Sequence, residues 1–228
     1  MRDNEILIRT VYDITDQGKM KMFKNTGVGV VEERGLQVRE VNVGDKIVWA
    51  GIPVANKIIV PEYLFDKVPL GLKDGIAVFG GIGAFVIQAV RESGLTFGEN
   101  IIVLGDGVLK KIVSQIIILF GIHNLDLEYA CKSDVIIDGI FVCPKGEKYI
   151  NLITKFLRDK SVITVLTEND VDIYSNLLLN NNQRIIFPTY PKLEGNNIYY
   201  PEAYTRWTFK EDIGLFLKLL KAGRVNPI

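Results

Sequence analysis

The residues with the clearest chemical meaning form a glycine turn near the middle of the chain. Gly105 and Gly107 belong to the segment GDGVLK, which follows the apolar run Ile101–Leu104 and precedes a helix-like stretch. A strand, a glycine turn and a helix in this order favour anion binding, because the free N–H groups of the helix N-terminus face the ligand. The first glycine permits the tight turn and the second lets the backbone approach a pyrophosphate. The predicted cofactor-binding residues of this turn are Gly105, Gly107, Val108 and Leu109.

A lysine stands where the third glycine of a dinucleotide-binding fingerprint is expected. In that fingerprint the third glycine lets the helix pack closely on the strand, which the Lys110 side chain cannot do without displacing something. Two interpretations stay open: Lys110 reaches a bound phosphate, or its side chain extends into solvent from a slightly displaced helix. The turn is therefore either a working nucleotide site or an inherited turn without a ligand.

An acidic residue follows the turn at a suitable distance for ribose recognition. Glu128 lies 23 residues after Gly105, at the end of the next expected strand, Asn124–Leu127. A carboxylate at about this spacing accepts hydrogen bonds from a ribose diol and favours NAD over NADP. The alternative is a solvated loop glutamate. The predicted cofactor is NAD or NADP, with Glu128 as a further binding residue.

The remaining polar residues assign no catalytic group. Asp13 and Asp16 could act as an acid–base pair, but a solvated turn explains them as well. His123 is the only histidine, and without cysteine or carboxylate partners it predicts no metal site. Cys131 and Cys143 lack paired spacing, which indicates free thiols in a cytoplasmic protein.

Composition excludes several classes of partner. Lys and Arg together number 27, as do Asp and Glu, so no basic surplus predicts nucleic-acid binding. The longest apolar run, Ile112–Ile122, is too short to span a bilayer, and no signal peptide is expected. With 48% hydrophobic residues, the 228-residue chain can bury a substantial core.

The chain divides into two parts with different patterns of apolar and polar residues. Short alternating segments separated by turn residues come first and predict a small β-barrel lobe. After Pro69 an apolar helix is expected at 75–93, and then strands and helices alternate, which predicts a parallel, doubly wound sheet. An amphipathic helix is expected at 208–222. The expected strands are 5–12, 27–33, 38–41, 46–50, 54–60, 101–104, 124–127, 134–137, 161–166 and 184–187, and the other expected helices are 108–120, 148–157 and 173–179.

Four segments in this order resemble the medium-chain dehydrogenase/reductase superfamily, and most closely its zinc-free branch, often fused to a second oxidoreductase domain. They are VGVVEERGLQVREVNVGDKIV at 28–48, ANKIIVPEYLFDKVP at 55–69, the glycine-turn unit at 98–121, and YPEAYTRWT at 200–208 with LLKAGRV at 219–225. The resemblance implies an α/β fold: a trimmed Rossmann-like nucleotide-binding domain at 70–189, and a reduced GroES-like β lobe at 1–69 and 190–228.

This chain also departs from the superfamily's pattern. The cysteine after the first strand, the Gly-His-Glu segment and the four-cysteine lobe of zinc members are absent. Segments are also missing between Gly18 and Gly27 and between Glu128 and Asp134. Tyr204, Arg206 and Trp207 either line a cleft or fasten the returning chain to the β lobe.

Two functions follow as expectations. The first is a zinc-independent NAD(P)-dependent oxidoreductase acting on a small-molecule substrate, in which the cofactor supplies the hydride chemistry. The second is a catalytically degenerate relative that binds a metabolite or a partner protein as a scaffold. The apolar strand 184–187 at a sheet edge further predicts a homodimer, which light scattering would test.

Overall fold

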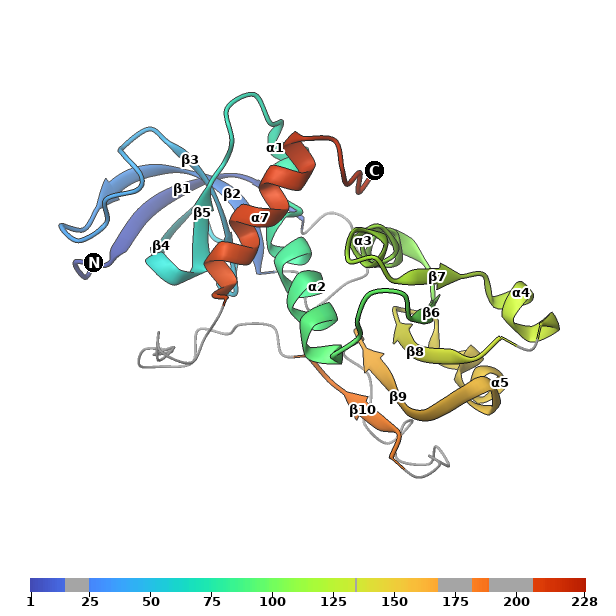
Figure 1. Ribbon diagram of the computed structural model, residues 1–228. Coiled ribbons are helices and arrows are strands. Elements are labelled where there is room, and N and C mark those ends of the chain that lie inside the picture. Colours follow the sequence, from blue (N-terminus) through green and yellow to red (C-terminus); the bar gives the residue numbers. More distant parts are fainter. Residues whose placement is uncertain (15–24, 134, 168–181, 189–206) are drawn as a thin grey trace. The chain divides into compact units, whose positions relative to one another are not determined.

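The computed structural model describes residues 1–14, 25–133, 135–167, 182–188 and 207–228 (Figure 1). The chain divides into two units. Unit 1 comprises Met1–Phe85, Thr189–Asn226 and Ile228, and unit 2 comprises Val86–Pro188 and Pro227.

Unit 1 is built on a curled antiparallel sheet, sheet A, with strand order β4-β1-β2-β3-β5. Its strands are β1 (Glu5–Asp13), β2 (Thr26–Arg34), β3 (Lys46–Ala50), β4 (Lys57–Pro61) and β5 (Phe65–Lys67), and the 3-10 turn η3 (Glu62–Leu64) precedes β5. Ile6 and Ile8 on β1 are fully buried while Arg9 is exposed, which is the alternation of a half-buried strand. This sheet confirms the predicted β lobe.

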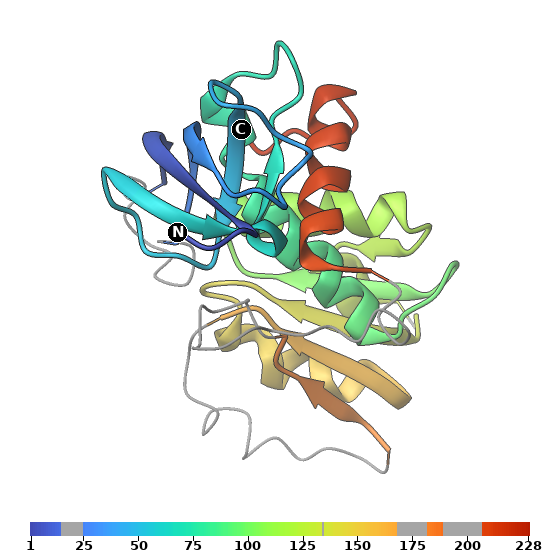
Figure 2. The same cartoon turned by 90° about the vertical axis from the view of Figure 1, so that its left-hand side faces the viewer.

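Three helical elements complete unit 1: α1 (Asp74–Ala77), the start of α2 (Gly80–Ser93), and α7 (Phe209–Lys221). Thr208 begins α7 with a capping box, in which its side chain accepts from the Glu211 N–H while the Glu211 carboxylate accepts from the Thr208 N–H. Helix α7 lies beside β5 (Figure 1, Figure 2). Phe216 on α7 is fully buried, and it fills the space above Gly83 of α2.

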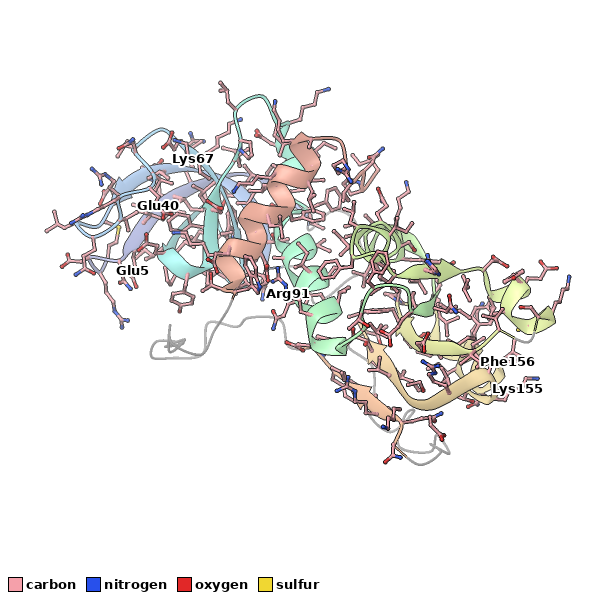
Figure 3. All side chains as sticks on the ribbon, in the orientation of Figure 1. Glu5, Glu40, Lys67, Arg91, Lys155 and Phe156 are labelled. Atoms are coloured by element: carbon pink, nitrogen blue, oxygen red, sulfur yellow. The ribbon has the colours of Figure 1, made fainter. Side chains whose placement is uncertain are left out.

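The Asp66 carboxylate of unit 1 is buried against helix α7, and this burial disfavours its charged form. Burial raises the pKa of Asp66 above its usual range, and the backbone N–H of Lys67 and the cations Lys210 and Lys218 offset this only in part. The Asp66 Oδ2 atom lies where a Cβ on Gly214 of α7 would stand, 2.1 Å away. Glu40, a second carboxylate of this unit (Figure 3), adds repulsion.

We expect Asp66→Asn to raise the melting temperature at pH 7. A folded-state pKa above the unfolded value means that the charged form disfavours the folded state, so stability falls as pH rises through this window. The gain from Asn should therefore shrink as the pH is lowered towards about 4, where the unfolded carboxyl protonates. Thermal unfolding of both proteins at pH 7 and pH 4 measures this, and an equal or larger gain at pH 4 would contradict it.

Unit 2 is built on a parallel sheet, sheet B, with strand order β10-β9-β8-β6-β7. The strands are β6 (Asn100–Leu104), β7 (His123–Leu125), β8 (Ile137–Val142), β9 (Leu157–Val165) and β10 (Arg184–Ile186). Every residue of β8 is buried, as expected for a central parallel strand. The predicted doubly wound sheet is thereby confirmed.

Helical segments connect the successive strands of sheet B. Helix α3 (Gly107–Leu119) packs on β6 and β7, and α4 (Leu127–Lys132) follows β7. A short run of η4 (Glu147–Tyr149), α5 (Ile150–Ile153) and η5 (Thr154–Phe156) connects β8 to β9. Lys155 and Phe156 (Figure 3) close this run with a cation–ring contact, the Nζ lying 4.9 Å from the ring centroid.

Several predicted elements differ in type or bounds from those observed. The strand predicted at 134–137 instead runs from Ile137 to Val142, because Asp138-Gly139, a pair typical of turns, lies inside it. Asp138 is buried there, accepting from the Asn100 N–H at 2.8 Å and pairing with Arg158. The predicted helix 148–157 is three short helical turns, and the predicted strand 38–41 is irregular. The helix predicted at 173–179 lies outside the described residues.

One helical stretch, Asp74–Ser93, is long and apolar enough to cross a membrane by length and composition alone. In this structure 72% of its apolar window is buried inside the molecule, as in the core helix of a folded domain. Gly80 and Gly83 show why, since Val48 of sheet A and Leu217 of α7 lie beside Gly80, and Phe216 of α7 lies beside Gly83.

Candidate functional site

The predicted glycine turn joins β6 to α3, and both glycines use backbone angles that favour glycine. Gly105 has φ +109° and Gly107 has φ +85°. A Cβ on Gly105 would stand 2.5 Å from the carbonyl oxygen of Cys143 and 2.7 Å from that of Pro144. A Cβ on Gly107 would meet no atom within 4 Å. The first glycine therefore serves the packing of the protein itself, and the second leaves open space.

A segment after β8 packs against this turn. Asp106 donates its backbone N–H to the carbonyl oxygen of Pro144 at 3.0 Å, and Cys143 donates its own to Leu104 at 2.9 Å. The Lys145 ammonium lies 3.7 Å from the Asp106 carboxylate. The backbone of the turn is thus fastened to the end of β8, and one of its N–H groups already has an acceptor.

A pocket of about 370 Å³ opens beside the turn, within unit 2. Its walls come from the end of β6, the glycine turn, α3, β7, the start of α4, and η4, which places it at the carboxyl ends of two parallel strands. Ligands of open α/β sheets bind at such a place. The lining residues are Val103, Leu104, Gly105, Asp106, Lys110, Asn124, Leu125, Asp126, Leu127 and Tyr149.

Lys110 lines this pocket and is half-buried. It lies in the first turn of α3, whose N-cap, Asp106, makes no side-chain hydrogen bond to the helix. The structure therefore brings a cation and the N-cap residue of α3 to the same cavity, whereas the predicted residues Gly107, Val108 and Leu109 do not line it. A cation beside a helix N-terminus attracts anions. Of the two interpretations from the sequence, this placement favours the phosphate-facing one.

Two carboxylate residues line the pocket, Asp106 and Asp126, whereas the predicted Glu128 does not. Asp126 directly follows β7, and its Oδ1 accepts from the N–H groups of Glu128 at 2.8 Å and Tyr129 at 3.2 Å, which caps α4. Glu128 lies inside α4, with its side chain 75% exposed and paired with Lys132. The strand that was predicted to end at Leu127 ends at Leu125, which moves the first acidic residue after it to Asp126.

Sequence reasoning missed Asp126 because it assigned this residue to the strand interior. The signal that could have found it is the pattern of Asp126 followed by Leu127-Glu128, since Asp is a strong N-cap and acidic residues favour the first turn of a helix. With that pattern a helix begins at Leu127, and the strand must end before Asp126.

The other predicted candidates bring no reactive group to this pocket. Cys143 is fully buried, and burial raises the pKa of its thiol, so it stays protonated. His123 is exposed, with its Nδ1 3.2 Å from the Asn100 Oδ1. Asp13 ends β1, and Trp207 is 48% exposed, both in unit 1. Asp16, Tyr204 and Arg206 lie outside the described residues.

Metal ligands do not cluster in the part of the chain that the structure describes. Within it, no group of three or more His, Cys, Asp or Glu side chains could hold a metal ion. The described residues thus offer no zinc centre of the usual four-ligand kind.

Comparisons with known proteins identify the fold. No family model matches the sequence. No curated protein matches it either. Among solved structures, alcohol dehydrogenase TADH from Thermus sp. ATN1 aligns over 100% of this chain and 84% of its own, with 15% identity and a TM-score of 0.68. The quinone oxidoreductase from Coxiella burnetii aligns over 99% and 81%, with 14% identity and a TM-score of 0.67.

A third structure is that of a protein described as a zinc-binding dehydrogenase, from Sinorhizobium meliloti 1021 and bound to NADP. It aligns over 99% of this chain and 83% of its own, with 13% identity and a TM-score of 0.64. At such identities the comparison establishes the fold and not the activity. The chain has the fold of medium-chain dehydrogenase/reductase structures, and the resemblance seen in the sequence is confirmed at this level.

Proposed function

We propose that this chain is a nucleotide-binding protein with a medium-chain dehydrogenase/reductase fold, independent of zinc, whose unit 2 binds the nucleotide in the pocket beside Gly105. The observation that carries the proposal is the convergence of three groups on one cavity. These are the N-terminus of α3, the Lys110 ammonium and the Asp126 carboxylate.

Each of these groups matches a different part of a nucleotide. The α3 N-terminus and Lys110 suit a phosphate, because free N–H groups and a cation both favour negative charge. Asp126 suits a ribose diol, which donates hydrogen bonds to a carboxylate. The side chains of Leu125 and Leu127 offer apolar surface for a base. Asp126 also disfavours the extra phosphate of NADP, since the two negative charges repel each other.

Of the two functions expected from the sequence, the degenerate relative has the stronger support. The Asp106 N–H is engaged by Pro144, Lys110 occupies the place of the third glycine, and the Cys143 thiol is held neutral. An oxidoreductase acting through NAD(H) is the second candidate, favoured by the retained turn at Gly105 and Gly107. The cytoplasmic location stays a prediction, and so does the homodimer through the sheet edge at β10.

The test of the proposal is nucleotide binding by Asp126 and Glu128 variants. Asp126→Ser keeps an N-cap side chain for α4 while removing the carboxylate. We expect it to weaken binding of ADP and NADH by about tenfold, a loss of about 1.4 kcal/mol. Glu128→Ala, which removes an exposed carboxylate outside the pocket, is the matched control and should leave affinity unchanged.

Isothermal titration calorimetry of the three proteins measures these affinities, and thermal shift gives an independent readout, because a ligand of the folded state raises the melting temperature. No binding of any nucleotide at millimolar concentration would overturn the proposal. A loss of affinity in Glu128→Ala, with Asp126→Ser unchanged, would move the ribose contact back to Glu128.

A further inference from the structure

We infer that the pocket is built for a nucleotide that ends in a phosphate, a nucleoside mono- or diphosphate, and not for a dinucleotide. The inference rests on the proposed function, since it names the class of ligand that the same site takes. It starts from Lys110 and from the segment Cys143–Gly146, the two features in which the site departs from a dinucleotide fingerprint.

The charge at Lys110 suits a terminal phosphate. A phosphate monoester carries about 1.5 to 2 negative charges at pH 7, whereas each phosphate of a dinucleotide is linked on both sides and carries one. The N-terminus of α3 supplies partial positive charge equal to roughly half a proton. Lys110 adds a full positive charge to the pocket lining, and the Asp106 carboxylate in that lining lies 3.7 Å from the Lys145 ammonium. Lys110 can therefore balance the additional negative charge that a terminal phosphate carries over an internal one.

The chain after β8 covers the path on which a dinucleotide would continue. In the strand order β9-β8-β6-β7, a dinucleotide crosses from the β7 side of β6 to the β8 side, where the order reverses. The carbonyl groups of Cys143 and Pro144 lie against Gly105 on that side. A Cβ on Gly146 would lie 2.8 Å from the carbonyl carbon and oxygen of Leu104, so this segment packs backbone to backbone on the end of β6.

An N–H group that a pyrophosphate would use is already engaged. Asp106, between the two glycines, donates its N–H to the Pro144 carbonyl at 3.0 Å. A pyrophosphate approaching the turn would have to break this hydrogen bond and leave a carbonyl without its donor, which disfavours its binding. A phosphate bound further along, at the first turn of α3 and Lys110, leaves the bond intact.

The size of the cavity agrees with a single nucleotide. Its volume of about 370 Å³ stands near the lower end of the range for small-molecule pockets, about 300 to 1,000 Å³. A dinucleotide consists of two joined nucleotides and would extend beyond these walls.

The experiment compares AMP, ADP, adenosine and NADH as ligands of the full chain by calorimetry. We expect AMP or ADP to bind at least about tenfold more tightly than NADH, and adenosine to bind as weakly as NADH or more weakly. Lys110→Gly, which restores the third glycine, should lose about tenfold in AMP and ADP affinity and gain affinity for NADH. Lys110→Met keeps the aliphatic stem and should lose AMP and ADP affinity without the gain.

The matched control is Lys111→Met, one residue further along α3, where the side chain is exposed and lies outside the pocket lining. It should bind all four ligands as the unaltered chain does. Binding of NADH as tight as that of ADP, or a Lys110→Gly variant with an unchanged ratio of ADP to NADH affinity, would overturn the inference while leaving nucleotide binding in place. Binding of none of the ligands would overturn the proposed function as well.

Discussion

Gly105→Ala is expected to lower the free energy of unfolding of unit 2 by about 3 kcal/mol and to remove nucleotide binding. At φ +109° an alanine is strained, at a cost of about 1 to 3 kcal/mol. Its Cβ would also stand 2.5 to 2.8 Å from backbone atoms of Cys143 and Pro144, which cannot rotate away as a side chain can. Relief requires the segment after β8 to move, and with it the wall of the pocket.

Comparison with Gly107→Ala separates the energetic cost of the positive φ angle from the cost of the steric clash with the segment after β8. This glycine has a comparable positive φ of +85°, but a Cβ there meets no atom within 4 Å. We expect it to lose only the cost of the backbone angle, about 1 kcal/mol. Urea titrations followed by circular dichroism would measure both variants. If Gly105→Ala cost no more than Gly107→Ala, the contact with the β8 segment would not constrain the turn.

The sequence predicted the layers of the fold well because their signals are local. Apolar runs such as Ile101–Leu104 are long enough to mark buried strands, and Gly105-Asp106-Gly107 marks where one of them turns into a helix. The capping box at Thr208 and Glu211 likewise fixes the start of α7 within one residue of the prediction. These features depend on residues close together in the chain, so one sequence suffices to find them.

What the sequence could not predict depends on partners far away in the chain. Asp138 lies inside a buried strand only because Asn100 and Arg158, 38 and 20 residues away, satisfy its carboxylate. Strand β9 gains a bulge at Arg158–Lys160, since Ile137 pairs with Leu157 and Gly139 with Val162. Neither arrangement has a local signal, and both moved strand boundaries by several residues.

The same distinction applies to the candidate site. The glycines of the turn were found, because their role follows from their place after a strand. The sequence leaves the role of Lys110 open, because that role depends on walls of the pocket that come from β7, α4 and η4. The engagement of the Asp106 N–H by Pro144 joins residues 38 positions apart, and no spacing rule in the sequence would indicate it.

Phe216→Ala is expected to lower the free energy of unfolding of unit 1 by about 3 to 5 kcal/mol. Phe216 is fully buried on α7, and truncating such a ring loses its transfer free energy and leaves a cavity. The cavity would open directly above Gly83 of α2, because a Cβ on that glycine would stand 2.0 to 2.2 Å from three carbons of the ring. Urea or thermal unfolding measures the loss.

The effect of Gly83→Ala on the free energy of unfolding should have opposite signs in the unaltered chain and in the Phe216→Ala variant. This makes Gly83→Ala the sharper test of the same contact. In the unaltered chain the added methyl collides with the Phe216 ring, and overpacking of this kind costs about 1 to 3 kcal/mol. In the Phe216→Ala background the ring is gone, so the methyl fills part of the cavity and gains up to about 1 kcal/mol from the better helix propensity of alanine. A double-mutant cycle would report this coupling, whereas additive losses would mean that the two side chains do not share this space. The coupling is expected because glycine is unfavourable inside a helix by itself. At position 83 this cost is offset by the space that glycine leaves for the Phe216 ring of α7.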